Sequence, residues 1–146
     1  KVRDAIFEKG DVLMPPVSDG DYTDVFVLEA EKETEFGMNV IAETTIKKAE
    51  KPTLSDFENA TILYTLQQSE NGWIPKESIS WYYALHYKKA TTKFEKIGQL
   101  TVDKTYDASK DFQSFSNWDN IKDFQDAYYA NIEKLKCDVT FFLESF

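Results

Sequence analysis

The pattern of hydrophobic and polar positions predicts about five antiparallel strands between residues 24 and 103. The clearest alternation runs over 78–88, where Ile79 and Trp81 fall on one face of a strand and Tyr82 falls on the other. The run 24–30 is rich in residues that favour β-strands, and its apolar residues occupy both faces. The expected strands cover residues 24–30, 39–47, 61–68, 78–88 and 92–103.

Turn signals divide these strands. Residues 31–37 would connect the first two strands, and 52–59 would form a loop with one helical turn. Asn71-Gly72 favours a tight hairpin, because both residues accept positive φ angles. The alternation in the last run shifts by one position near Gly98, as it would at a β-bulge.

The C-terminal region changes to helical spacing. Apolar residues recur three or four positions apart from Trp118 to Phe146, which predicts a long amphipathic helix over 116–143 packed against the sheet. The run 139–142 is also compatible with a final strand. Val2, Ala5 and Ile6 indicate a short N-terminal helix that ends before Gly10. We therefore expect residues 1–146 to form a single α+β domain.

Composition narrows the class of protein. The chain has 146 residues, of which 42% are hydrophobic, and a net charge of −9. Apolar runs stay well short of the ~20 residues that cross a membrane, so we expect a soluble protein without membrane insertion. The acidic balance disfavours binding to nucleic acid, which depends on neutralising phosphates. The single cysteine, Cys137, excludes an intrachain disulfide, and no cofactor motif is present. The chain begins at Lys1, which indicates a processed or trimmed start and leaves both the cytoplasm and an extracytoplasmic location open.

Two acidic regions are candidate sites. Asp19, Asp21 and Asp24 could surround a hard cation, but the central glycine and the distal glutamate of a calcium loop are missing, so we favour a solvated turn over a metal site. Glu29, Glu31 and Glu33 alternate and would share one face of a strand. They could contact a basic partner, or they could protect an edge strand from pairing with other chains.

The aromatic residues and the single histidine supply the remaining candidates. Aromatic side chains make up 15% of the chain, and Trp73, Tyr82 and Tyr129 fall off the expected core faces, where they could form a contact surface. His86 lies beside Tyr82 on the same predicted face. A Cys137–His86 catalytic pair is disfavoured, because nothing in the sequence places the two together. Four lysines cluster around Tyr87 and Phe94, at positions 88, 89, 93 and 96, and are typical of a lysine-rich hairpin end.

No catalytic constellation emerges, and we lean against an enzyme. The first hypothesis is a non-catalytic protein-interaction domain with an acidic and aromatic surface, whose partner is another protein of basic character. The second is a carrier that holds a small hydrophobic ligand between the sheet and the C-terminal helix. The third is a hydrolase that uses carboxylates.

Overall fold

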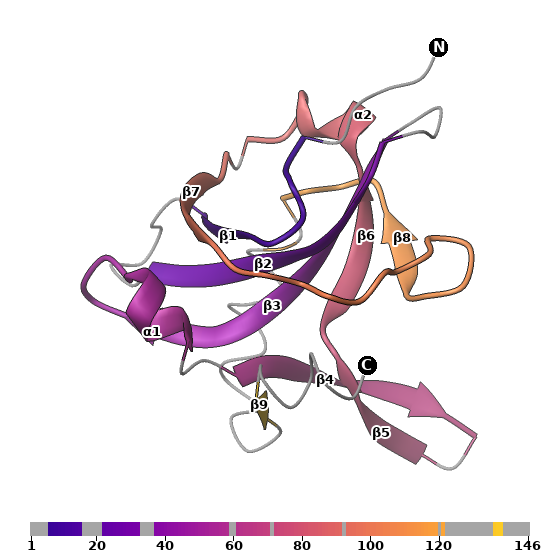
Figure 1. The fold of residues 1–146 in the computed structure, drawn as a ribbon. Coiled ribbons are helices and arrows are strands. Elements are labelled where there is room, and N and C mark those ends of the chain that lie inside the picture. The colour runs from indigo at the N-terminus through magenta and orange to yellow at the C-terminus, as the bar shows by residue number, and fades with distance from the viewer. Residues whose placement is uncertain are drawn as a thin grey trace.

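The protein, described by a computed structural model, is mostly β-sheet (Figure 1). The structure describes residues 6–15, 22–32, 37–58, 61–70, 72–91, 93–119, 121 and 136–138. The elements in chain order are β1 (Asp11–Met14), β2 (Tyr22–Glu31), β3 (Met38–Lys48), α1 (Leu54–Glu58), β4 (Thr61–Ser69), β5 (Gly72–Glu77), β6 (Ile79–Tyr83), α2 (Ala84–Tyr87), β7 (Glu95–Gln99), β8 (Gln113–Phe115) and β9 (Lys136–Asp138).

The described strands form one mixed sheet around β3. The main order is β5-β4-β3-β2-β1-β7, with β6 joined to β3 and β8, and β9 joined to β4. One edge of β3 pairs with β2, whereas the other pairs with β6 through Met38–Ala42 and with β4 at Thr44. The β6–β8 pair is parallel and the other described pairs are antiparallel. Figure 1 shows β2 and β3 as long curved strands, with the β4–β5 hairpin extending away from them.

The central strands are buried on both sides, because successive side chains of a strand point to opposite faces. The first face carries the core residues Val12, Phe26, Leu28, Met38, Val40, Ala42, Phe57, Ile62, Ile79, Trp81 and Tyr106. The second face carries the core residues Leu13, Val25, Val27, Ile41, Tyr82, Trp118 and Ile121. In β2 the two sets alternate from Val25 to Leu28, so this apolar run is buried on both sides.

Different segments cover the two faces. On the first face, Phe57 of α1 packs edge-on against Phe26 with ring centroids 5.1 Å apart, and Tyr106 lies 5.8 Å from Phe112. On the second face, Phe7 and Trp118 meet with ring centroids 6.0 Å apart. The first cover is thus partly helical, whereas the second is formed mainly by aromatic side chains from irregular segments.

Several sequence predictions are confirmed at the level of single elements. The runs 24–30, 39–47 and 61–68 coincide with β2, β3 and β4, and the predicted helical turn is α1. The hairpin forms at Ser69↔Gly72, where Gly72 has a φ of 98°. Near Gly98 the register passes from Val12↔Gly98 to Leu13↔Lys96, so the expected bulge lies beside this glycine.

The predicted α+β class with a long C-terminal helix is wrong. Ser116–Asp119 form an irregular turn, and Lys136–Asp138 form β9, so one continuous helix over 116–143 is not present. Cys137 of β9 pairs with Ile62 of β4, which also pairs with Thr44 of β3. The start of β4 therefore has a neighbouring strand on both edges. This long-range pairing overrides the local apolar spacing. Residues 122–135 and the alternative strand 139–142 lie outside the described residues.

The predicted N-terminal helix is also wrong over the part that the structure describes. Residues 6–9 form bends and a turn, and Asp11–Met14 form a strand that sequence analysis missed. The buried Asn39 amide holds the backbone of Phe7: Phe7 N donates to Asn39 Oδ1 at 3.1 Å, and Asn39 Nδ2 donates to Phe7 O at 2.9 Å. This pair of bonds replaces helical hydrogen bonds and places Phe7 over the second face.

The third correction concerns the strand predicted over 78–88. β6 ends at Tyr83 and the chain continues as α2. The reason is that the strand loses its partner there: β3 begins at Met38, which is opposite Tyr83, and Ala84 N instead donates to Gly37 O at 2.9 Å.

The described part of the chain contains no helix with the length and apolar character that a membrane span requires.

Candidate functional site: a pocket beside α2

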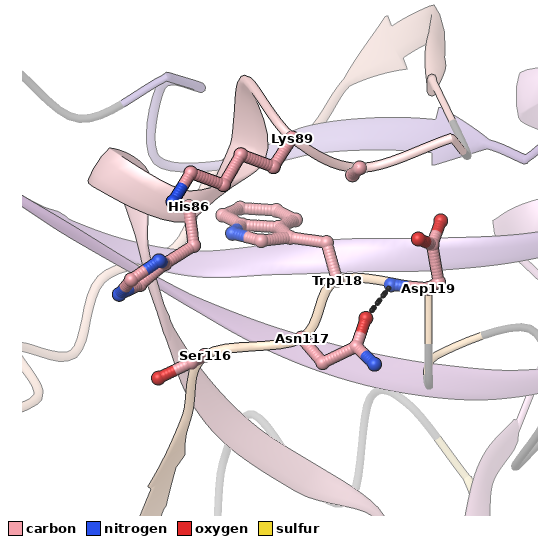
Figure 2. Close-up of a pocket in the computed structure, with 7 residues that line it drawn as sticks. His86, Lys89, Ser116, Asn117, Trp118 and Asp119 are labelled. Carbon is pink, nitrogen blue, oxygen red and sulfur yellow. Dashed lines mark hydrogen bonds between the residues drawn. The ribbon is translucent and has the colours of Figure 1, made fainter.

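A surface pocket of about 180 Å³ lies where α2 meets the turn that follows β8 (Figure 2). His86 and Lys89 come from α2 and its C-terminal end, and Ser116, Asn117 and Trp118 come from the turn. Figure 2 shows Lys89 reaching across the Trp118 indole towards the side on which His86 lies. The remaining lining residues are Ala90 and Asp119.

Two features of the fold create this junction. β6 runs parallel to β8 with Tyr82 opposite Phe115, so both strands end at the same level and their following segments lie side by side. α2 then turns the chain away from the sheet, with its small residue Ala84 buried at the first position. Residues 86–89 and 116–119 therefore meet although about 30 positions separate them in sequence.

Hydrogen bonds fix the walls of the pocket. Trp118 Nε1 donates to Tyr83 O at 2.8 Å, which ties the turn to the end of β6. Thr91 donates to Asp119 twice, from its backbone N at 3.2 Å and from its Oγ1 at 3.0 Å. Asp119 N donates in turn to Asn117 Oδ1 at 3.0 Å. The acidic group of the pocket is therefore already bonded to the loop after α2.

Aromatic side chains support the floor. Trp118 is fully buried, and its ring centroid lies 4.9 Å from that of Tyr87 and 5.4 Å from that of Tyr82. Burial raises the pKa of Tyr87, whose hydroxyl accepts a hydrogen bond from Phe94 N at 3.0 Å. Lys93 lies over the Tyr87 ring, with its Nζ 4.4 Å from the ring centroid, and donates to Tyr87 O. This packing gives the pocket a stable base.

The polar groups left at the mouth are mainly donors. Lys89 is exposed and forms no ion pair with any described residue. Asn117 uses its Oδ1 to accept from Asp119 N, which leaves the two N–H groups of its Nδ2 for another partner. The Ser116 hydroxyl and the His86 ring nitrogens make no hydrogen bond within the described part of the chain.

A second, larger pocket differs in this respect. It has a volume of about 470 Å³ and is lined by Lys51, Pro52, Thr53, Leu54, Lys96 and Ile97. Both of its lysines form ion pairs with acids of the same chain. Lys51 lies 3.2 Å from Glu95, and Lys96 lies 3.1 Å from Asp11. The pocket beside α2 is therefore the better candidate for binding a charged group.

The cation site proposed from sequence gains no support. Asp19 and Asp21 lie outside the described residues, and Asp24 is fully buried in β2. Burial raises the pKa of Asp24 from 3.8 to about 7, and the nearby Asp56 carboxylate adds to the effect. Among the described residues, no group of three potential metal ligands lies together. Burial also raises the pKa of Glu43 well above its ordinary value, although a hydrogen bond with Ser78 acts to lower it.

The acidic strand residues are partly used inside the protein. A register shift at Leu28 places Glu29 opposite Val40 and Glu31 opposite Met38. Both glutamates therefore lie on the first face of the sheet. Glu29 Oε2 accepts from Lys9 Nζ at 3.0 Å and from Tyr106 N at 3.2 Å. Glu33 lies outside the described residues.

The other predicted site residues are scattered. Tyr82 is buried within the second face, so the expectation that it lies off the core is wrong. Trp73 pairs with Gln68 through the backbone of β5, and its side chain lies outside the description. Tyr129 is also outside it. Cys137 belongs to β9, and the structure does not place it in the lining of the His86 pocket.

Sequence reasoning missed most of the pocket. It selected His86 and noted Lys89 in a lysine cluster, but it interpreted 116–119 as the start of a helix. The signal that joins these residues is the parallel β6–β8 pair, which is a long-range contact with no local sequence pattern. No protein-family model matches the chain, and no curated protein or solved structure matches it either.

Proposed function

We propose that this chain is a non-catalytic domain that binds another protein through the surface around α2. The observation that carries the proposal is the pocket of about 180 Å³ that is lined by His86, Lys89, Ser116 and Asn117 above a floor of buried aromatic side chains. Pockets for drug-sized ligands have volumes of about 300–1,000 Å³. This one has room for a single side chain or a chain end, which suits one anchoring residue of a protein partner.

The distribution of ion pairs supports a contact surface at this place. Several lysines elsewhere pair with acids of the same chain, as in Lys9–Glu29, Lys32–Glu8 and Lys48–Asp56, whereas Lys104 and Lys110 form no ion pair among the described residues. Lys88 and Lys89 are exposed and pair with no described acid, on a protein whose net charge is −9. A local positive surface on an acidic protein orients an approaching partner by its charge.

The other hypotheses from sequence have less support. The carrier needed a cavity beneath a helix over 116–143, and that helix is interrupted. The acidic surface stays a prediction, because Glu33 is not described and Glu29 is bonded to Lys9. The hydrolase hypothesis also stays a prediction, and the buried carboxyl groups of Asp24 and Glu43 are not among the residues that line the pocket beside α2.

The test is quantitative affinity capture from an extract of the source cells. The immobilised wild-type chain is compared with the double variant Lys88→Glu and Lys89→Glu, and with Lys110→Glu as a matched exposed control. We expect a protein that is retained by the wild type and the control and lost from the double variant. Equal capture by all three chains would contradict binding through this surface.

A further inference from the structure

The inference that the structure carries furthest rests on the proposed function and specifies its partner. We propose that the pocket beside α2 binds a carboxylate of the partner protein, supplied by an aspartate or glutamate side chain or by a chain terminus. The partner chemistry follows from the hydrogen-bonding groups that the pocket leaves unused and from the size of the pocket.

Two of those groups are donors only. Lys89 can only donate, and Asn117 offers its Nδ2 because its Oδ1 already accepts from Asp119 N. The Ser116 hydroxyl and the His86 ring can each donate as well as accept. The indole N–H of Trp118 is used by Tyr83 O, and both carboxylate oxygens of Asp119 accept from Thr91. A ligand group that pairs with Lys89 and Asn117 therefore brings acceptors and negative charge.

The orientation of Asn117 is fixed by chemistry. The backbone N of Asp119 can only donate, so the side-chain atom 3.0 Å from it must be the oxygen. In Figure 2 the nitrogen of Asn117 points away from that bond. The Asn117 side chain is thus held by a hydrogen bond within the turn, and this bond sets the position of its Nδ2 donor.

The pocket is large enough for an amino-acid carboxylate, with a volume of about 180 Å³. This accommodates a carboxylate with its adjoining methylene groups. The single positive side chain at the mouth, together with the imidazole, matches one negative charge better than a doubly charged phosphate.

The experiment uses the ring signals of His86 in NMR, which are unambiguous because the chain has one histidine. Three short peptides with the same neutral flanking residues serve as probes. The first has a central glutamate and an amidated C-terminus, the second has glutamine in its place, and the third has the glutamine and a free C-terminal carboxylate. We expect saturable shifts with the first or the third peptide and none with the second.

The first and third peptides identify the source of the carboxylate. A saturable response to the first alone assigns a side chain, and a response to the third alone assigns a chain terminus. Equal responses to all three peptides, or no saturable response to either carboxylate peptide, would overturn the inference.

Two variants make the test specific to the pocket. Asn117→Asp retains the oxygen that accepts from Asp119 N and replaces only the unused donor with an anionic oxygen, so the turn is preserved. We expect it to abolish the response. Lys89→Gln should weaken binding about two- to fivefold, as for an exposed ion pair, whereas Lys110→Gln should leave it unchanged. Unaltered binding by Asn117→Asp would overturn the assignment.

The variants also separate this inference from the proposed function. A partner captured equally by wild type and Asn117→Asp, but lost from the Lys88→Glu and Lys89→Glu chain, would overturn the carboxylate pocket and support protein binding around α2. Loss of the partner with Asn117→Asp would support both.

Discussion

The two faces of the sheet are each closed by one fully buried tryptophan, but in opposite ways. On the first face, Trp81 belongs to β6 and its Nε1 donates outwards to Asp111 O of the covering segment at 2.7 Å. On the second face, Trp118 belongs to the covering segment and its Nε1 donates inwards to Tyr83 O of β6 at 2.8 Å. The end of β6 is thus bonded to both covers.

This difference explains why the pocket lies on the second side. Trp81 is enclosed by a cover that packs α1 and Tyr106 against the same face. Trp118 is itself the cover, and the turn that carries it exposes Ser116 and Asn117 to solvent beside α2. A stabilising residue in a turn brings its polar neighbours to the surface, whereas a stabilising residue in a strand does not.

The largest expected effect comes from removing either indole. We expect Trp81→Ala and Trp118→Ala each to lower the free energy of unfolding by about 3–5 kcal/mol, because both side chains are fully buried. Urea denaturation measures the loss. Only the Trp118 variant should also move the His86 ring signals in NMR, since Trp118 and His86 line the same pocket.

Conservative variants keep this comparison interpretable if the alanine variants do not fold. Trp81→Phe and Trp118→Phe retain an aromatic ring and lose the indole donor. Each should cost less than the alanine change, and the effect on His86 should again be confined to position 118. A His86 shift of the same size from position 81 would contradict the separation of the two faces.

The two faces also show how much the sequence could predict. Alternation within single strands identified β2, β3 and β4, because burial on a pleated strand has a period of two. It failed at Tyr83, and helical spacing failed at 116–119 and 136–138, where the outcome depends on which strand offers a partner. Spacing alone did not distinguish Trp118 on a turn from the same residue on a long helix.

The candidate site shows the same limit. His86 could be selected because it is the only histidine, and Lys89 because it belongs to a lysine cluster. Asn117 and Ser116 could not be selected, since their role arises from a parallel strand pair and from which of their atoms are already bonded. Such information exists only after the chain has folded.

A smaller effect should come from Asp24 in β2 and Glu43 in β3, two buried carboxyl groups whose pKa is raised by burial. Asp24 has a folded pKa of about 7 instead of 3.8, so the folded state holds a proton that the unfolded chain releases. As pH rises from about 4 to 7, this group should therefore lower the free energy of unfolding by at most about 4 kcal/mol. At higher pH its effect should level off. Asp24→Asn should remove this loss and be more stable than wild type at about pH 8.

Glu43 in β3 provides the matched test. It pairs across the strands with Val25 of the second face, and burial raises its pKa in the same direction as that of Asp24. Glu43→Gln should also stabilise the protein above neutrality, and the double variant should be the least sensitive to pH. Thermal unfolding between about pH 4 and 8 measures these slopes. A wild-type protein that becomes more stable over this range would contradict the buried, protonated carboxyls.

The smallest effect concerns the bond that links the two covers. Glu29 joins Lys9, which follows Phe7 of the second cover, to the backbone of Tyr106 in the first. Glu29→Gln keeps an oxygen for Tyr106 N and removes the charge, so we expect a loss of about 1 kcal/mol. The side chains of Lys9 and Glu29 are 28% and 14% exposed, and this partial burial protects their ion pair from water and salt. Lys32→Gln is the control, because the Lys32–Glu8 pair is far more exposed, at 42% and 62%, and should contribute nothing measurable. Equal urea midpoints for wild type and Glu29→Gln would show that the Lys9–Glu29 ion pair does not contribute to stability.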